Sequence, residues 1–186
     1  MNLWLRLLWA YLSYRSRGPL TVADVCKRNF RVWPTDLDIF NHMNNGKFLS
    51  LADLGRFDWL LRSGIWPALK KRNWYPVVVA ETITFRKSLE PWMLFSIESK
   101  IVGWDDEAFF VEQRFVHNHQ IYTKVIVKIR YLVNPRGIVT PAQVIEYLGG
   151  WPGKAPKLEP WIAKWNEDTK LPKGKEPAPS VWPGEK

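Results

Sequence analysis

The chain has 186 residues, 46% hydrophobic and 24% charged, which is ordinary for a soluble globular protein and favours one domain with one core. Its net charge of +9 favours partners that carry anionic groups, but the charge is dispersed and no nucleic-acid-binding motif is present, so we expect no nucleic-acid partner. The single cysteine, Cys26, excludes an intrachain disulfide and a cysteine-based zinc site, and we expect it to be small, buried and unreactive. This cysteine usage favours a reducing compartment, so we expect a cytoplasmic protein, with peripheral contact to a membrane surface as an addition.

Residues 1–18 are predicted to form an amphipathic helix that ends before Pro19. The apolar run 3–12 is interrupted by Arg6 and is half the length of about 20 residues that a spanning helix needs. At the helical period one narrow polar stripe appears, which consists of Asn2, Arg6, Ser13 and Arg17. Leu, Trp and Tyr cover most of the remainder, so the helix is expected either to lie in a membrane interface or to dock on the core or on a partner subunit.

A strand, a loop and a long helix follow in chain order. Residues 28–33 alternate and are predicted to form a strand, and residues 35–45 form a loop. From Gly46 to Arg62 apolar residues recur at three- and four-residue spacing, which is typical of a helix. Gly64 stands where the C-terminal cap of that helix is expected.

The hydrophobic period then changes to two, which predicts long strands at 77–88, 93–103, 108–116 and 122–133. Their short connections indicate antiparallel neighbours. One long helix with such a sheet predicts an α+β architecture over residues 19–150, with the helix covering one face. Short helices are expected at 141–148 and 160–166. Residues 151–186 form a Pro- and Lys-rich C-terminal extension whose end, from Lys170, has no core of its own.

Five polar residues lie just before the long helix: Asp36, Asp38, His42, Asn44 and Asn45. One interpretation is a polar loop whose Asp and Asn side chains cap the helix. The other is a hydrolytic site, in which a carboxylate attacks an acyl carbon or activates water and the imidazole polarises a carbonyl or orients the carboxylate. Unpaired backbone N–H groups at the helix start would stabilise a developing oxyanion.

The stretch DLDIFNHMNNGKF, residues 36–48, resembles the pattern D-x-D-x-x-x-H-V-N-N-x-x-Y of hot-dog-fold thioesterases, the 4-hydroxybenzoyl-CoA thioesterase-like and acyl-ACP thioesterase-like families. The segments ADLGR at 52–56, GWDDEAFFVEQRFV at 103–116 and residues 77–89 resemble the branch called thioesterase superfamily member six-like. The resemblance covers roughly residues 30–148, and the motifs together are more specific than a lone D-x-D.

This resemblance implies a hot-dog fold, in which a long antiparallel sheet wraps around a central helix, and a homodimer or dimer of dimers with sites at the dimer interface. It implies hydrolysis of an acyl-CoA or acyl-ACP substrate to release a fatty acid, with no cofactor and no metal. Asp38 matches the catalytic carboxylate and His42 the family histidine. The residues expected to bind substrate are Asn44, Asn45, Gly46, Phe48 and Asp53.

The sequence departs from the pattern at two positions. Phe48 replaces a tyrosine, and Phe40 stands where plant acyl-ACP thioesterases carry a catalytic asparagine. These departures and the N-terminal helix favour the alternative of a catalytically weak hot-dog protein that binds acyl chains or lipid at a membrane surface. A hydratase of this fold is disfavoured, because its Asp and His are separated by four residues whereas Asp38 and His42 are separated by three.

Other titratable residues have structural interpretations. Asp53 is expected to pair with Arg56 on the same helix, and Glu81 to pair across strands. The two histidines of the HNHQ segment, His117 and His119, are expected to be exposed turn residues rather than metal ligands.

Overall fold

The computed structural model describes residues 3–172 and 176–181, so Asn2 and parts of the C-terminal extension lie outside the described residues. The helices are α1 (Leu3–Ser13), α2 (Asn45–Arg62), α3 (Ile65–Lys71), α4 (Pro141–Tyr147) and α5 (Pro160–Asp168), with short 3-10 turns η1 (Arg15–Arg17) and η2 (Pro34–Asp36). The strands are β1 (Cys26–Arg31), β2 (Trp74–Phe85), β3 (Leu94–Trp104), β4 (Phe109–His117), β5 (Gln120–Val133) and β6 (Ile138–Val139).

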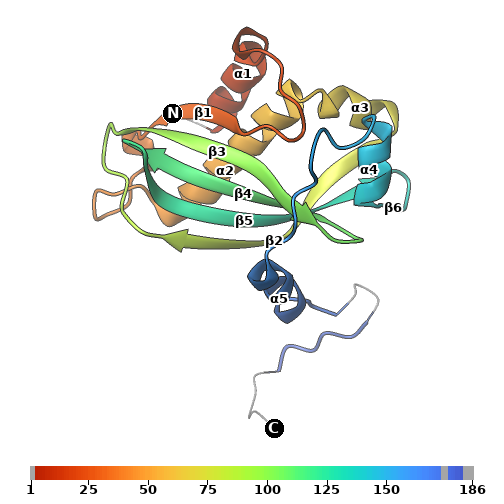
Figure 1. The fold of residues 1–186 in the computed structure, drawn as a ribbon. Coiled ribbons are helices and arrows are strands. Elements are labelled where there is room, and N and C mark those ends of the chain that lie inside the picture. Colours follow the sequence, from red (N-terminus) through yellow and green to blue (C-terminus); the bar gives the residue numbers. More distant parts are fainter. Residues whose placement is uncertain (1–2, 173–175, 182–186) are drawn as a thin grey trace.

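The strands form one curled antiparallel sheet that wraps around α2 (Figure 1). The order is β1-β3-β4-β5-β2, and β6 pairs with β5. The tight turn between β4 and β5 is possible because Asn118 and His119 adopt positive φ angles of 46° and 59°, which a two-residue hairpin turn requires. His119 is thus an exposed turn residue as predicted. The turn prediction for His117 was wrong, since His117 ends β4 and its Nδ1 lies 2.6 Å from the carbonyl oxygen of Leu94.

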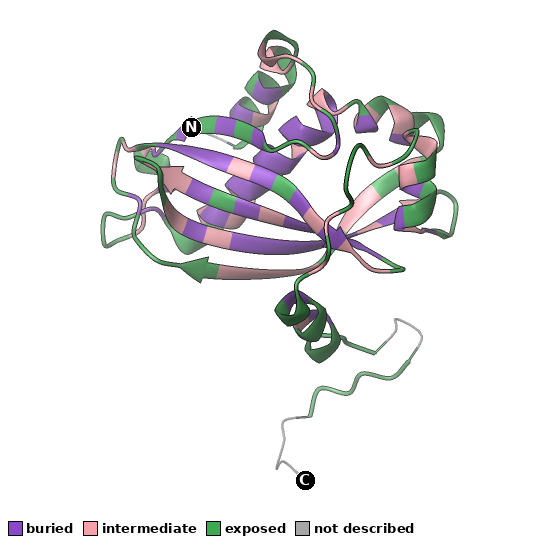
Figure 2. Ribbon diagram, viewed as in Figure 1, coloured by how far each residue is buried: buried purple, intermediate pink, exposed green. Residues whose placement is uncertain are grey.

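The helix α2 lies inside the curl and is buried along most of its length (Figure 2). Gly55 permits the close approach, because a Cβ at this position would lie 3.0 Å from Cγ2 of Ile97 and 3.2 Å from Nε2 of Gln113. Phe48 fills the space near the start of the helix, with its ring centroid 5.0 Å from that of Phe115 and 5.1 Å from that of Phe85. These contacts hold the first turn of α2 against the sheet.

The predicted elements are all present, with shifted ends. The first strand begins at Cys26 and ends at Arg31, two residues earlier at each end than predicted, and Val32 and Trp33 connect it to η2. The strand predicted at 77–88 begins at Trp74 and ends at Phe85, where the N–H groups of Arg86 and Lys87 both turn to the carbonyl oxygen of Tyr122. The short helix α3 was not predicted, because its seven residues contain a proline and span too few turns to show a period.

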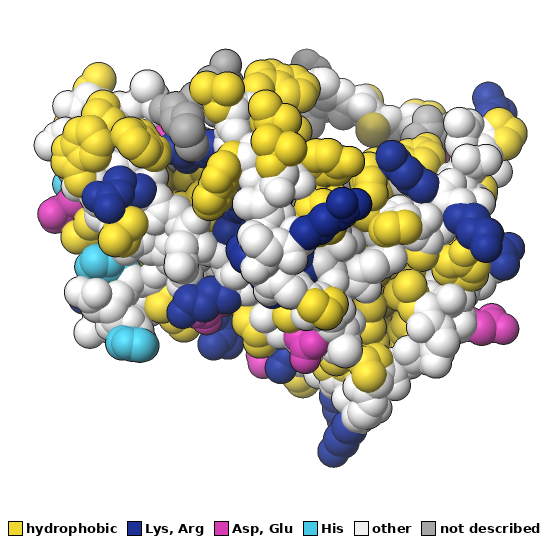
Figure 3. Space-filling model, turned by 90° about the horizontal axis from the view of Figure 1, so that it is seen from above, with side chains coloured by type: hydrophobic (Ala, Val, Ile, Leu, Met, Phe, Trp, Pro, Cys, Tyr) yellow, Lys and Arg dark blue, Asp and Glu magenta, His cyan; other side chains and the backbone are white. Residues whose placement is uncertain are grey.

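The N-terminal helix α1 reverses the usual amphipathic arrangement. Its buried residues are Arg6 and Ala10, and Arg6 pairs with the buried carboxylate of Asp36. Seven of its large apolar side chains are exposed, namely Leu3, Trp4, Leu5, Leu8, Trp9, Tyr11 and Leu12, although the Trp9 ring also contacts the guanidinium of Arg28. Hydrophobic side chains gather on the face of the molecule on which α1 lies (Figure 3). Arg6 and Arg17 of the predicted polar stripe therefore face the protein, and a Leu- and Trp-rich side is exposed. We call these seven side chains the α1 apolar face.

A buried carboxylate joins the N-terminal segment to the second half of α2. Asp58 is fully buried and accepts hydrogen bonds from Arg17 at 2.7 Å and from Arg28 at 3.1 Å, with Arg62 at 3.8 Å. The thiol of Cys26 lies 3.5 Å from the same carboxylate. Burial, together with the Asp58 charge, raises the pKa of Cys26 to about 12, so the thiol stays protonated at neutral pH. This confirms Cys26 as a small, buried, unreactive residue.

The C-terminal helix α5 covers part of the outer face of the sheet (Figure 1). On β4 the side chains of Phe109 and Val111 point into the main core, whereas Phe110 between them points outward. Phe110 packs there against Ile162 of α5. Part of the C-terminal extension is therefore packed against the domain rather than free of it.

The two edges of the sheet differ in chemistry. The edge strand β1 is short, and its outward residues are Lys27, Asn29 and Arg31. The opposite edge strand, β2, is twice as long, 12 residues against 6, and exposes apolar side chains at Tyr75, Val78, Val79 and Phe85. Charged side chains protect a sheet edge from pairing, whereas a long apolar edge invites it.

The charge of Asp58 should be essential for stability, because its loss would leave the buried guanidinium of Arg28 without a compensating charge. We expect Asp58→Ala to lower the free energy of unfolding by about 3–5 kcal/mol. Asp53, which is on the same helix and also pairs with an arginine but is 68% exposed, provides the matched control. Asp53→Ala should cost less than about 1 kcal/mol in chemical denaturation, and equal losses for the two variants would contradict this account.

Candidate active site

The segment between β1 and α2 is folded back on itself. Asp36 is buried, and its side chain accepts a hydrogen bond from the N–H of Trp33 at 3.0 Å and pairs with Arg6. Its carbonyl oxygen accepts the N–H of Asn44 at 2.8 Å. Asp36 thus joins both ends of the loop 37–43, and its carboxylate is occupied by structural contacts rather than free for chemistry.

Asp38 lies within that loop and is only partly buried. Its Oδ1 accepts the main-chain N–H groups of Phe40 at 2.9 Å and His42 at 3.3 Å, so neither bond occupies Oδ2. The N–H of Asp38 donates to the carbonyl oxygen of His42 at 2.8 Å. Asn41 completes the turn with a φ of 60°, a left-handed conformation that asparagine tolerates. The carboxylate is therefore held in place by the backbone of its own loop.

Asn44 caps α2. Its side-chain oxygen accepts the N–H of Gly46 at 2.9 Å, and its carbonyl oxygen accepts that of Lys47. The expectation that N–H groups from Gly46 onward are free for an oxyanion was therefore wrong for these two residues. Within the described part of the chain, the N–H of Asn45 has no acceptor, and it remains as the donor at the helix start.

One pocket of about 240 Å³ gathers much of the predicted site. From the loop and the start of α2 come Asp38, His42, Met43, Asn45 and Phe48, and from the far side come Phe85, Arg86, Lys87 and Ser88. The structure thus brings together four of the seven predicted residues, namely Asp38, His42, Asn45 and Phe48. Asn44 and Gly46 adjoin the pocket through the helix cap and do not line it.

Asp53 lies away from this pocket, in a separate polar cluster. The guanidinium of Arg56 pairs with Asp53, as predicted, and with Glu81 at 3.0 Å, and donates to Gln113 at 2.6 Å. The prediction that Glu81 pairs across strands was wrong, because its partner is on α2. Burial raises the pKa of Glu81, and the Arg56 charge opposes that rise. The cluster joins α2 to β2 and β4, so its visible role is to connect helix and sheet.

Two cationic residues were missed as part of the site. Arg86 and Lys87 follow β2 and line the same pocket as Asp38. Arg86 donates to the carbonyl oxygen of Ile121 at 3.0 Å, and Lys87 donates to Gln120 at 2.9 Å, so the start of β5 positions both. In the sequence, the only sign that Arg86 and Lys87 belong to the site is that two cations are adjacent at the end of a predicted strand. The sequence does not show which loop the end of that strand faces.

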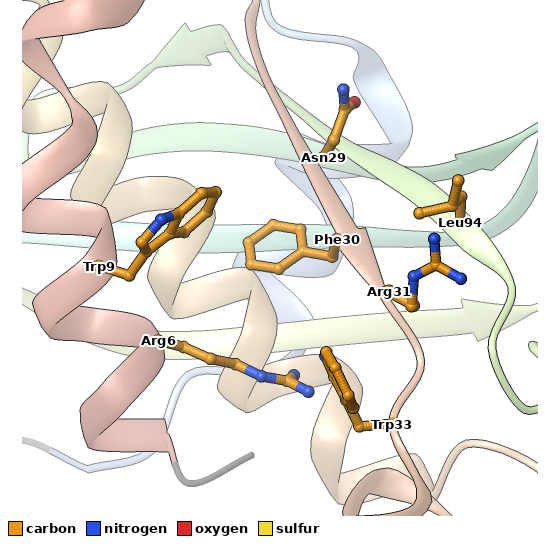
Figure 4. Close-up of a pocket in the computed structure, with 7 residues that line it drawn as sticks. All are labelled: Arg6, Trp9, Asn29, Phe30, Arg31, Trp33 and Leu94. Atoms are coloured by element: carbon orange, nitrogen blue, oxygen red, sulfur yellow. The ribbon is translucent and has the colours of Figure 1, made fainter.

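A second pocket, of about 410 Å³, lies between α1 and β1 (Figure 4). Trp9 and Arg6 of α1 face Phe30 and Trp33 across it, and Arg31 of β1 and Leu94 of β3 complete its lining together with Asn29. Its walls are mainly apolar and aromatic. Among the described residues, no group of three or more His, Cys, Asp or Glu is placed to hold a metal ion.

The first pocket has the parts of a hydrolytic site. Asp38 and His42 both line it, the Asp38 carboxylate is held by main-chain N–H groups, and the start of an 18-residue helix supplies partial positive charge. A carboxylate next to a helix N-terminus can act as base or nucleophile toward a carbonyl whose developing oxygen charge the helix stabilises. Arg86 and Lys87 add an anion-binding side to the same pocket.

Comparisons with known proteins agree with this geometry. The family model described as the thioesterase-like superfamily matches residues 32–166. A protein called THEM6 from Xenopus laevis is 37% identical over 119 residues, which cover 62% of this chain and 58% of that protein. Its namesake from Danio rerio is 33% identical over 147 residues, 77% of this chain and 70% of that one. The chain thus spans a little over half the length of the first of these relatives.

Solved structures show the same fold at low identity. The probable thioesterase YbaW from Escherichia coli superposes with a TM-score of 0.63 at 19% identity, over 66% of this chain and 96% of that one. The curled sheet around a central helix is therefore the hot-dog fold. From the family match, the fold and the two relatives, the chain belongs to the thioesterase-like superfamily, in its branch of thioesterase superfamily member six-like proteins.

Proposed function

We propose that the protein hydrolyses acyl thioesters, with Asp38 as the catalytic carboxylate. The observation that carries the proposal is the single pocket in which Asp38, His42 and the start of α2 meet. The family supports thioester hydrolysis in general. The choice of a fatty acyl-CoA or acyl-ACP as substrate is the finer part of the proposal.

In the proposed reaction Asp38 either takes a proton from water, whose oxygen then attacks the thioester carbonyl carbon, or attacks that carbon itself. In both routes the carbonyl oxygen becomes an oxyanion beside the Asn45 N–H and the helix start. Collapse breaks the carbon–sulfur bond, and the thiolate leaves and takes up a proton. In the second route water then hydrolyses the acyl-carboxylate anhydride and regenerates Asp38, so both routes yield a carboxylic acid and a thiol.

The two cationic residues of the pocket support the proposal that the acyl group of the substrate is attached to an anionic carrier. Coenzyme A carries phosphates and acyl carrier protein is acidic, so Arg86 and Lys87 suit either one. Their side chains already bond to the start of β5, which fixes their positions before substrate arrives.

Asp38→Asn should reduce kcat/KM for acyl thioesters by at least about 10²-fold, because the amide can neither accept a proton nor attack the carbonyl. The measurement is thiol release from acyl-CoA of several chain lengths and from acyl-ACP, which also identifies the carrier. Asp168→Asn, at an exposed carboxylate on α5, is the control and should match wild type. Equal rates of thiol release for wild type and Asp38→Asn would rule out Asp38 as the catalytic carboxylate.

We propose that the protein is a homodimer joined along β2. The long apolar edge of β2 is open in the single chain, and the loop tip beside Asp38 exposes Ile39 at 93% and Phe40 at 73%. Pairing two β2 edges would remove the exposed backbone groups and bury the apolar side chains.

At micromolar concentration, light scattering should therefore give the mass of a dimer or a multiple of it. Val78→Lys combined with Val79→Lys should shift the mass toward monomer, because two charges on a paired edge repel their symmetry copies. Val25→Lys is the matched control, since Val25 is 47% exposed, close to the 43% and 45% of the two edge valines, and lies outside β2. A monomeric wild type would rule out this interface.

We propose further that the α1 apolar face contacts a membrane surface. None of the helices in the described ranges is long and apolar enough to cross a bilayer. Because Arg6 and Arg17 are already paired with carboxylates, only the exposed Arg15 among the arginines of residues 3–17 is left to attract anionic lipid, and burial of Leu and Trp would supply most of the contact. Substrates with long acyl chains partition into bilayers, so this location would bring enzyme and substrate together.

Vesicle co-sedimentation tests this contact without deleting α1, whose removal would leave Asp36 unpaired. The triple variant Trp4→Ser, Leu8→Ser, Leu12→Ser should lower the partition coefficient by at least about 10²-fold, since each buried side chain contributes about 1.5–3 kcal/mol. Wild type should bind neutral and anionic vesicles to a similar extent. Identical binding by the triple variant would leave a partner subunit as the contact of α1.

A second candidate function, an acyl-chain or lipid binder with weak catalysis, is favoured by the α1 apolar face and by Phe48, whose ring supplies no hydroxyl to the pocket. It predicts that wild type binds acyl chains while its thiol release equals that of Asp38→Asn.

A further inference from the structure

We infer that Arg6 is a positioning residue for the catalytic loop, so that α1 controls where Asp38 stands through one buried ion pair. The inference rests on the proposed function, because it assigns a role in that reaction to a helix outside the family match, which begins at residue 32. It concerns the contact between α1 and Asp36 and needs no membrane.

Asp36 is the point where the loop is closed. Its side chain accepts the N–H of Trp33 on the β1 side, and its carbonyl oxygen accepts the N–H of Asn44, the cap of α2. Within the loop, Leu37 and Met43 form a bridge, and Asp38 bonds to His42. A displacement of Asp36 would therefore move both ends of the segment that carries Asp38.

The contact that holds the Asp36 side chain from outside the loop comes from α1. Arg6 reaches from α1 toward Trp33 (Figure 4), and its guanidinium pairs with the Asp36 carboxylate. The two side chains are only 4% and 2% exposed, so loss of Arg6 would remove the countercharge of a buried carboxylate. An Asp36 without Arg6 would be a buried carboxylate with its Trp33 bond alone, and the loop would have to open to hydrate it.

The same N-terminal segment has a second ion pair that provides the comparison. Arg17 pairs with Asp58, in the second half of α2. If Arg17 is replaced, the Asp58 carboxylate still has its ion pairs with Arg28 and Arg62. Both arginines hold the N-terminal segment on the domain, but Arg6 alone of the two contacts the loop. A general weakening of the fold and a specific loss of loop position can therefore be separated.

The experiment compares Arg6→Met with Arg17→Met in the full chain, at a temperature at which circular dichroism shows all variants folded. Arg6→Met should lower kcat by about 10²-fold, the cost of misplacing a catalytic group by about 1 Å, and leave KM within about threefold. Hydrogen exchange of the amides at 38, 42 and 44 should become at least tenfold faster. Arg17→Met should change neither quantity, and Arg6→Lys should recover part of both.

If Arg6→Met alone does not fold, the double variant Arg6→Met, Asp36→Asn removes both charges and keeps an acceptor for Trp33. Losses in the same direction but smaller are expected of it, because the contact from α1 is gone while no buried charge forces the loop to open. The inference would be overturned if Arg6→Met, or the double variant where Arg6→Met does not fold, had both the kcat and the loop exchange rates of wild type. If wild type itself releases no thiol, the proposed function fails, and the exchange rates still decide whether Arg6 positions the loop.

Discussion

The enclosure of α2 by the curled sheet is the constraint from which the other features follow. A helix buried along most of its length cannot leave charges unpaired, so Asp58 and Arg56 have partners from other elements. Enclosure also leaves the ends of the helix as the places where its backbone groups can meet a substrate. At the N-terminal end, the cap by Asn44 takes two of the N–H groups, and the loop with Asp38 lies beside the one that remains. The position of the pocket is therefore a consequence of the packing.

Much of the fold could be predicted, because its signals are local. The strands alternate, the long helix repeats at three and four residues, and short connections specify antiparallel pairing. Asp38, His42, Asn45 and Phe48 were predicted from a resemblance carried by one short segment at the helix start, and they line one pocket because that segment is continuous. Arg86 and Lys87 could not be placed, because their distance from Asp38 depends on how strongly the sheet curls. Asp53 lies outside that pocket for a related reason: helical rotation carries it to the side where Arg56 and Glu81 meet.

For α1, the periodicity of the sequence predicted a polar stripe but not whether that stripe faces solvent or the protein. Water and a buried carboxylate can both hydrogen-bond to an arginine, and the sequence does not distinguish them. The carboxylates at 36 and 58 are distant in sequence, and only the fold places them beneath the helix. Once they are there, the pairing of Arg6 and Arg17 leaves most of the leucines and tryptophans of α1 exposed, while Leu7 packs against the core.

The outward-facing Phe110 has a consequence for assembly. Since α5 covers part of the outer side of the sheet around Phe110, that part of the sheet is already occupied within the chain. Any second copy that approached this side would meet the exposed surface of α5 instead of the strands.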